Sequence, residues 1–270
     1  MTSAMPGTKN PLVREPFERY RQQSKSHLTS HALADFRKSP RLHRDKQLGL
    51  IPDVDRPAFV VGRAAHTLVL EGPEVFEKTY AVGGPVNPKT GNPYGANTKA
   101  FAEWAAEQGK PVLTETNFDL VAHLAASVRG HDVAAELLDG VIAEGVVRMD
   151  YCGVPCQIRM DAFSPARGIV DLKTADDIDW FEADARRYGY AYQLAFYRAV
   201  LAVALGEAVP VHMVAVEKKP PFRCGVWRVG EDVLGMVQKE NEAAIGRLRK
   251  CREADTWPTG LEAVRVFDYL

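Results

Sequence analysis

The stretch from Met160 to Lys173 constrains the fold more than any other part of the chain. Two runs of strand-forming residues flank a short Ser-Pro and Arg-Gly loop, and each run carries one carboxylate, Asp161 or Asp171. Lys173 follows Asp171 with a single residue between them, and alternate residues of a strand share one face. We therefore expect Asp171 and Lys173 to point the same way, with their apolar neighbours in the opposite layer.

This grouping of acids and a lysine suits the hydrolysis of phosphodiester bonds. Adjacent antiparallel strands could bring Asp161 and Asp171 together, and two carboxylates at a strand edge can hold Mg²⁺. A lysine beside them can orient or activate a water. The acid–x–lysine pair alone is weak evidence, because solvated strand faces often carry one. The apolar Val170 and Leu172 favour a buried strand, where charges are costly unless they bind something.

A long helix after this strand supplies further polar groups. The pattern predicts a helix over residues 184–205, with little but apolar residues after Gln193. Gln193 and Tyr197 are four residues apart and share a face that Tyr190 also lines. A polar pair on an otherwise apolar helix can buttress an active site or contact a phosphate.

Periodicity elsewhere predicts helices on both sides of a group of strands. We expect residues 1–25, which are polar and rich in proline and charge, to form a flexible lead-in to a single domain over residues 26–270. Helices are predicted at 29–36, 59–70, 98–108, 118–138 and 231–254. Strands are predicted at 146–150, 154–163, 169–173, 211–217 and 225–229, with a hairpin turn at Cys152-Gly153. This order predicts an α/β fold with a central mixed β-sheet flanked by helices.

Composition argues against several other classes of protein. The formal net charge is −1, which counts against a protein that coats nucleic acid by charge alone. No apolar run approaches the roughly 18 residues of a membrane span, and residues 1–10 have no apolar signal core, so we expect a cytoplasmic protein with no membrane partner. No glycine loop ends in lysine followed by serine or threonine, so we expect no ATP to be used by this chain.

The four cysteines form no recognisable site. Cys152, Cys156, Cys224 and Cys251 have a spacing that fits neither a disulfide scaffold nor paired zinc knuckles. We expect them to be reduced and structural.

In combination, these residues resemble the PD-(D/E)XK nuclease superfamily, which implies its restriction-endonuclease-like α/β core. Asp161 matches the first acid, and the tripeptide from Asp171 to Lys173 matches the acid–x–lysine. Residues 193–197 resemble the Gln-x-x-x-Tyr motif of the superfamily's exonuclease branch. The similarity sharpens to the phage and prophage exonuclease VIII (RecE-type) nucleases over residues 26–262. Runs at 62–71, 97–101, 171–178 and 254–258 carry that closer resemblance.

The resemblance implies a site for a divalent metal. His66, Asp161 and Asp171 would be ligands, with the Leu172 carbonyl as a backbone ligand. By itself His66 would more often be a structural histidine, and only its place in the family's motif reverses that expectation. We expect Mg²⁺, and Mn²⁺ should substitute because it accepts histidine more readily. Some relatives bind an iron–sulfur cluster through grouped cysteines, which this chain lacks, so we expect none.

The resemblance also implies the catalytic groups. Lys173 would position the attacking hydroxide and stabilise charge in the transition state, beside Asp161 and Asp171. Gln193 and Tyr197 would support Lys173 or the scissile phosphate. The sequence leaves open whether one or two metals act.

The sequence leaves more than one role open for several further residues. Glu144, just before the hairpin, would support the metal ligands or bind a second metal weakly, or would be a solvated acid at a strand start. Glu71 would cap its helix or support neighbouring residues rather than bind metal. Arg159 shares the Asp161 strand face and would contact phosphate or pair with a carboxylate. The basic stretch 37–46 is either a solvated helix face or a DNA contact. Its candidates for DNA binding are Arg37, Lys38, Arg41 and Arg44.

Three functions remain open from the sequence. The favoured one is a 5′→3′ exonuclease acting on double-stranded DNA ends, which leaves a 3′ overhang for a single-strand annealing protein in phage-type homologous recombination. Its polarity, its recombination role and a homo-oligomeric ring, a trimer or tetramer, are implied by the resemblance. The second is an endonuclease, which would cut closed circular DNA. The third is a catalytically decayed DNA-binding protein, against which the intact set of His66, Asp161, Asp171 and Lys173 argues.

Overall fold

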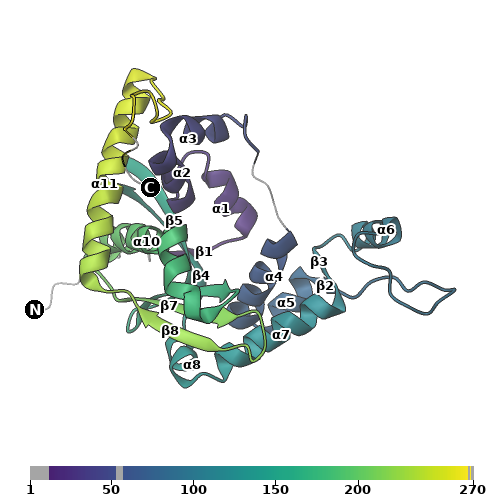
Figure 1. Ribbon diagram of the computed structural model, residues 1–270. Helices are drawn as coiled ribbons and strands as arrows, with labels where there is room; N and C mark the ends of the chain where they lie inside the picture. Colours follow the sequence, from purple (N-terminus) through teal and green to yellow (C-terminus); the bar gives the residue numbers. More distant parts are fainter. Residues whose placement is uncertain (1–11, 53–56, 267, 269–270) are drawn as a thin grey trace, which may run out of the picture.

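The computed structural model describes residues 12–52, 57–266 and 268. Its main feature is a six-stranded mixed sheet flanked by helices, as the sequence predicts (Figure 1). The strand order is β1-β4-β5-β6-β7-β8; β6 and β7 are parallel and the other neighbours antiparallel. The strands are β1 (Leu12–Arg14), β4 (Ile142–Tyr151), β5 (Val154–Ser164), β6 (Gly168–Ala175), β7 (Val211–Glu217) and β8 (Cys224–Arg228).

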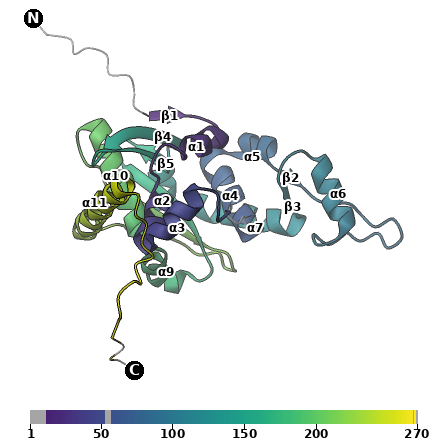
Figure 2. The ribbon, with the colours of Figure 1, turned by 90° about the horizontal axis from the view of Figure 1, so that it is seen from above.

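Helices cover both faces of this sheet (Figures 1 and 2). One face packs against α2 (Ser30–Lys38), α10 (Tyr190–Leu205) and α11 (Glu231–Ala254), around a core that includes Ile158 and Ile169. The other packs against α4 (Pro57–His66) and α7 (Glu115–Arg129), around a core that includes Ala162, Val170 and Leu172. Val170 and Leu172 therefore lie on the face opposite Ile169, as the alternation of strand residues predicts.

The predicted hairpin is present and is longer than expected. β4 and β5 pair from Ile142↔Phe163 to Tyr151↔Val154. The turn lies at Cys152 and Gly153, which both have positive φ, 52° and 72°, a conformation that tight turns require. This register carries the acids of β4 and β5 toward the same end of the hairpin.

Three predicted helices are interrupted in the structure. The expected helix 184–205 is α9 (Phe181–Tyr188) followed by α10, because Gly189 adopts the left-handed conformation between them. The expected helix 118–138 is α7 followed by α8 (Asp132–Leu138), whose N-terminus the His131 side chain caps. The expected helix 59–70 is α4 continued by a π-helical turn, η1 (Thr67–Glu71), a local irregularity common at functional sites.

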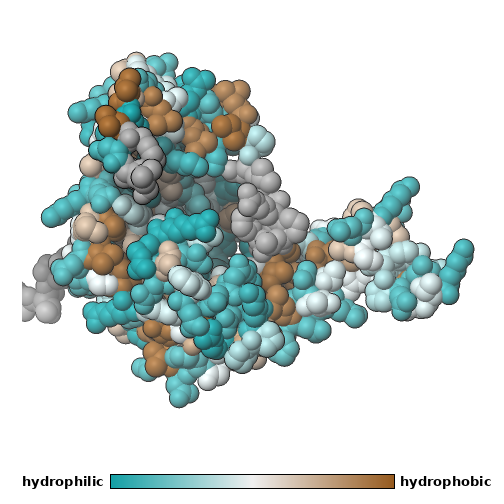
Figure 3. All heavy atoms as spheres, viewed as in Figure 1, coloured by the Kyte–Doolittle hydropathy of each residue, from teal (hydrophilic) through white to brown (hydrophobic). Residues whose placement is uncertain are grey.

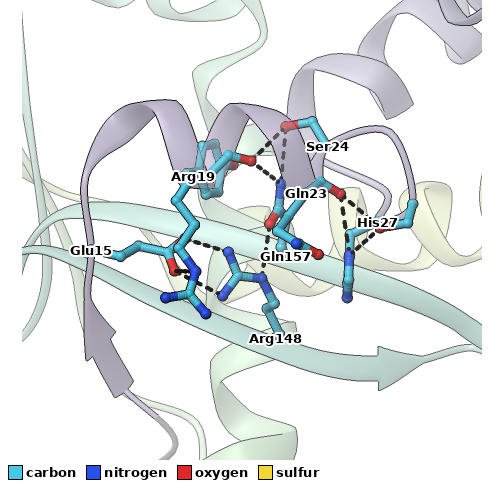
Figure 4. A network of polar contacts seen from close by, with 9 residues as sticks. Glu15, Arg19, Gln23, Ser24, His27, Arg148 and Gln157 are labelled. Atoms are coloured by element: carbon cyan, nitrogen blue, oxygen red, sulfur yellow. Dashed lines mark hydrogen bonds and ion pairs between the residues drawn. The ribbon is translucent and has the colours of Figure 1, made fainter.

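The expected flexible lead-in differs from the structure over residues 12–25; residues 1–11 lie outside the described part. Strand β1 pairs with β4, and helix α1 (Phe17–Gln23) follows it. A polar network holds this segment to the sheet (Figure 4). Arg148 on β4 pairs with Glu15, and Gln157 on β5 donates to the Tyr20 carbonyl oxygen at 3.0 Å. Local composition does not reveal these pairings, because the partners lie far along the chain.

A small outlying unit extends from the body in both views (Figures 1 and 2). It comprises a two-stranded parallel sheet, β2 (Ala81–Val82) with β3 (Val112–Leu113), and helix α6 (Lys99–Glu107). The remaining elements are α3 (Pro40–Gln47), α5 (Pro73–Thr79) and η2 (Ile178–Trp180). Of the helices in the described ranges, none has the length and apolar character needed to cross a membrane.

Candidate active site

Asp161 lies where β5 and β6 separate. Backbone pairing between the two strands ends at Ala162↔Val170. One residue further, Asp161 Oδ2 accepts a hydrogen bond from the Leu172 N–H at 2.9 Å. The side chain thus replaces a backbone acceptor of the sheet and satisfies a buried N–H that would otherwise be costly. This contact fixes the first acid of the predicted motif beside the second strand.

Asp171 and Lys173 share one face of β6, as predicted. The Lys173 Nζ lies 2.5 Å from Asp171 Oδ2, and Asp171 is only 1% exposed. Neither oxygen of Asp171 has a well-aligned hydrogen-bond donor. Burial raises the pKa of Asp171 to about 6, against the opposing effect of Lys173. A buried carboxylate with so few donors is the kind of group that a cation stabilises.

His66, Glu144 and Asp161 form the acidic and imidazole cluster of the site. One ligand atom from each lies within 4.8 Å of the others, and His66 Nδ1 is 3.5 Å from Asp161 Oδ2. Asp171 lies outside that span, but the charges of His66 and Asp161 both act on its pKa. Imidazole with carboxylates is a donor set that suits Mn²⁺ and is acceptable to Mg²⁺. The residues present therefore fit a divalent cation.

Glu144 lies closer to His66 and Asp161 than the sequence suggested. It lies within β4 rather than before the hairpin, between the Ala143↔Ala162 and Gly145↔Met160 pairs, and so opposite Asp161. Its φ of 56° is uncommon for a residue other than glycine. Burial and then the Asp161 charge raise the pKa of Glu144 to about 8. A turn at Cys152-Gly153 sets the register of the hairpin and so places residue 144 opposite residue 161. The predicted turn could therefore have identified the position of Glu144 from the sequence.

Helix α10 brings Gln193 and Tyr197 to the same side as Lys173. Gln193 Nε2 donates to the Tyr197 hydroxyl at 3.1 Å, and Tyr197 is 5% exposed. Burial raises the pKa of Tyr197, and the nearby Asp171 charge raises it further. The Lys173 ammonium also lies 4.9 Å from the centroid of the Tyr190 ring. The structure thus brings the predicted helical residues to the buried acid and lysine.

Arg159 and Glu71 flank the cluster. Arg159 Nε lies 2.7 Å from Glu144 Oε2, an ion pair without a well-aligned hydrogen bond. Glu71, at the end of η1, lies 3.6 Å from Arg14 on β1. Of the two readings for Arg159, the structure shows the pairing with a carboxylate.

Arg37 in the basic stretch makes internal contacts. Its guanidinium stacks 4.2 Å from the Tyr192 ring centroid and donates to Asn241 on α11. Burial lowers its pKa. These contacts indicate that Arg37 holds α2 to its neighbouring helices.

Lys38 and Arg41 are exposed, whereas Arg44 is half-buried, as Arg37 is, and its guanidinium lies 5.1 Å from the Trp257 ring centroid. Arg41 forms an ion pair with Asp45 at 2.9 Å, and Arg44 lies 3.6 Å from Asp255. Lys38 is exposed at the end of α2. The visible face of the molecule carries its apolar side chains in separate small groups among hydrophilic ones (Figure 3).

Comparisons with known proteins agree with this geometry. A family described as "PDDEXK-like domain of unknown function (DUF3799)" matches residues 29–268. The solved structure of a candidate exonuclease from Eubacterium rectale is similar with a TM-score of 0.68 and 17% identity, covering 96% of each chain. At that identity the likeness concerns the fold. LHK-Exo in complex with dAMP is 14% identical over 59% of this chain and 87% of its own, with a TM-score of 0.30, too low to carry an argument. No curated protein matches the sequence.

Proposed function

The chain belongs to the PDDEXK-like domain family, and from that premise we propose that it is a metal-dependent 5′→3′ exonuclease of double-stranded DNA. The observation that carries the catalytic part is the pair of the buried Asp171 and the half-buried Lys173, side by side on one strand next to Asp161 and His66. Nuclease domains of this kind hydrolyse phosphodiester bonds, and this arrangement of acids, imidazole and lysine suits that chemistry.

We infer that His66, Asp161, Asp171 and the Leu172 carbonyl hold the metal, with Glu144 as a further ligand. Bound there, Mg²⁺ or Mn²⁺ would lower the pKa of a coordinated water and offset charge on the phosphate. The Leu172 N–H faces Asp161. Since the N–H and C=O of one strand residue point to the same side of the strand, this supports the Leu172 carbonyl as a ligand on that side.

Lys173 is proposed as the group that orients the attacking water. Its ammonium is tied to Asp171 and faces the Tyr190 ring, so its position is restricted. The charge of Asp171 and then of Asp161 keeps the pKa of Lys173 above its ordinary value despite burial. Lys173 therefore acts as a fixed cation that stabilises charge on the phosphate, rather than as a base. Gln193 and Tyr197 support this group from α10.

The exonuclease assignment rests on further, independent support. Residues 193–197 match the motif of the superfamily's exonuclease branch, and the similar protein from Eubacterium rectale is described as a candidate exonuclease. We propose that three or four copies of the chain form a ring around duplex DNA. Its digestion would leave a 3′ overhang for a single-strand annealing protein in phage-type recombination. We also propose that it acts in the cytoplasm.

The catalytic proposal can be tested with paired lysine variants. Linear duplex DNA is incubated with Mg²⁺, with Mn²⁺ or with EDTA, using the wild type, Lys173→Met and Lys218→Met. Lys218 also pairs with an aspartate, Asp176, at 2.6 Å, but outside the acid cluster. We expect cleavage only with metal, its loss in Lys173→Met and its retention in Lys218→Met. Near-native cleavage by Lys173→Met would refute the proposed site.

A further inference from the structure

The segment formed by β1 and α1 lies outside residues 29–268, which the family match covers, yet it borders the candidate site. β1 pairs with residues 145–147 of β4, directly after Glu144. A Cβ built on Gly145 would lie 3.1 Å from the Leu12 side chain. Gly145 thus allows β1 to approach closely at the point where the β4 backbone presents Glu144.

Two side chains of this segment contact charged residues at the site. The Phe17 ring lies 4.9 Å from the Arg159 guanidinium, and Arg159 pairs with Glu144 at 2.7 Å. Arg14 pairs with Glu71 at 3.6 Å. A guanidinium over an aromatic face is attracted to it, so Phe17 restricts the position of the group that holds Glu144.

The segment is also anchored away from the site. Glu15, whose side chain is 3% exposed, pairs with Arg148 and with Arg19, and Gln157 donates to the Ser24 hydroxyl at 2.9 Å (Figure 4). These contacts fix α1 to β4 and β5 without using the acid cluster. The helix that carries Phe17 is therefore held in place by contacts that do not involve the acid cluster.

We propose that residues 12–23 support the metal site by positioning one of its ligands. Phe17 positions Arg159, and Arg159 positions Glu144 against His66 and Asp161, so the segment raises affinity for the divalent cation. Phe17 and Arg159 are positioning residues, because they act through Glu144. The inference rests on the proposed function in that a divalent cation binds at this cluster with Glu144 as a ligand.

Phe17 is the best position for the test, because its neutral variants leave the charge of the site unchanged. Phe17→Leu removes the aromatic face, Phe17→Tyr retains it, and Gln22→Ala alters an exposed neutral residue of the same helix. Glu144→Gln reports whether Glu144 contributes to binding. Each full-length variant is titrated with Mn²⁺ by calorimetry, and its melting temperature without metal is measured to control for loss of fold.

We expect Phe17→Leu to weaken Mn²⁺ binding by about two- to fivefold, the range for an exposed cation–π contact. Phe17→Tyr and Gln22→Ala should bind as the wild type does, and Glu144→Gln should bind more weakly than Phe17→Leu. Unchanged or tighter binding by a folded Phe17→Leu would overturn the inference, as would unchanged binding by Glu144→Gln.

Hydrogen exchange gives a second readout, independent of cleavage. Because coupling is reciprocal, Mn²⁺ should slow exchange of the amides of residues 17–24 in the wild type, and this effect should disappear in Phe17→Leu. Exchange that does not respond to Mn²⁺ would contradict the proposal. A wild type that binds Mn²⁺ with these couplings but cuts no DNA would refute the nuclease proposal alone.

Discussion

The carboxylate of Asp161 accepts a hydrogen bond from the backbone N–H of Leu172 at 2.9 Å. This contact occurs where β5 and β6 stop pairing, so one side chain both completes the sheet and borders the candidate metal site. Asp161 consequently has a structural role in addition to its proposed chemical one. The two roles can be separated, because an amide oxygen can accept the same hydrogen bond without carrying a charge.

Asp161→Asn and Asp161→Ala should therefore differ in stability. Asp161→Asn retains an acceptor for the Leu172 N–H, whereas Asp161→Ala leaves that buried group without one, at a cost of about 1–3 kcal/mol. Both should lose metal binding and cleavage. Urea unfolding of the two variants measures the difference. Equal unfolding free energies would show that the hydrogen bond has no structural weight.

Lys173→Met should reduce cleavage by a factor of roughly 100 or more, the scale of removing one group that stabilises transition-state charge. Affinity for Mn²⁺ should not fall, because the variant removes a cation from the site. The pKa of Asp171 should rise further, since Lys173 is what lowers it. Calorimetry with Mn²⁺ beside single-turnover cleavage checks this, and weaker metal binding would contradict it.

Asp171→Asn should lose both Mn²⁺ binding and cleavage while DNA binding survives. Asparagine preserves the shape of the buried side chain but not its charge, so the fold should be retained. Mn²⁺ calorimetry, cleavage and a DNA binding assay in EDTA distinguish these effects. Retained cleavage at a near-native rate would remove Asp171 from the site.

Stability without metal should fall as pH rises. Asp171 and Glu144 have pKa values raised to about 6 and about 8, so the folded state holds their protons more tightly than the unfolded state does. The resulting stabilisation is present below about pH 4, the ordinary range of such carboxyls, and is lost as pH rises through these folded values. Saturating Mn²⁺ favours the charged carboxylates and should remove this decline. Melting temperatures from pH 5 to 8.5, with and without Mn²⁺, provide the test.

The basic stretch should separate into structural and DNA-contacting residues. Arg37→Ala loses contacts with Tyr192 and Asn241, so it should mainly lower the unfolding free energy. Lys38 is exposed. If it contacts phosphate, Lys38→Ala should reduce the slope of log DNA affinity against log salt concentration by about one. DNA affinity measured from low to high salt, beside urea unfolding, tests both. An unchanged slope for Lys38→Ala would exclude that contact.

The sequence predicted those features of the fold that neighbouring residues determine, such as strand faces and tight turns. Strand alternation gave the shared face of Asp171 and Lys173, and the turn at Cys152-Gly153 gave the hairpin. The break at Gly189 and the change to a π-helical turn after His66 were missed, because apolar periodicity continues across them. The docking of β1 and α1 depends on partners far along the chain, such as Arg148 for Glu15, which no local pattern reveals.

The central claim, a metal-dependent exonuclease, is tested most directly with end-labelled DNA. Linear duplex labelled at the 5′ or the 3′ end is digested beside a covalently closed circle, with Mg²⁺ or EDTA and with Lys173→Met as control. We predict early release of the 5′ label as mononucleotide, an intact circle, and no reaction in EDTA or with Lys173→Met. A nicked or linearised circle would indicate an endonuclease, and the absence of any metal-dependent cleavage would contradict the account.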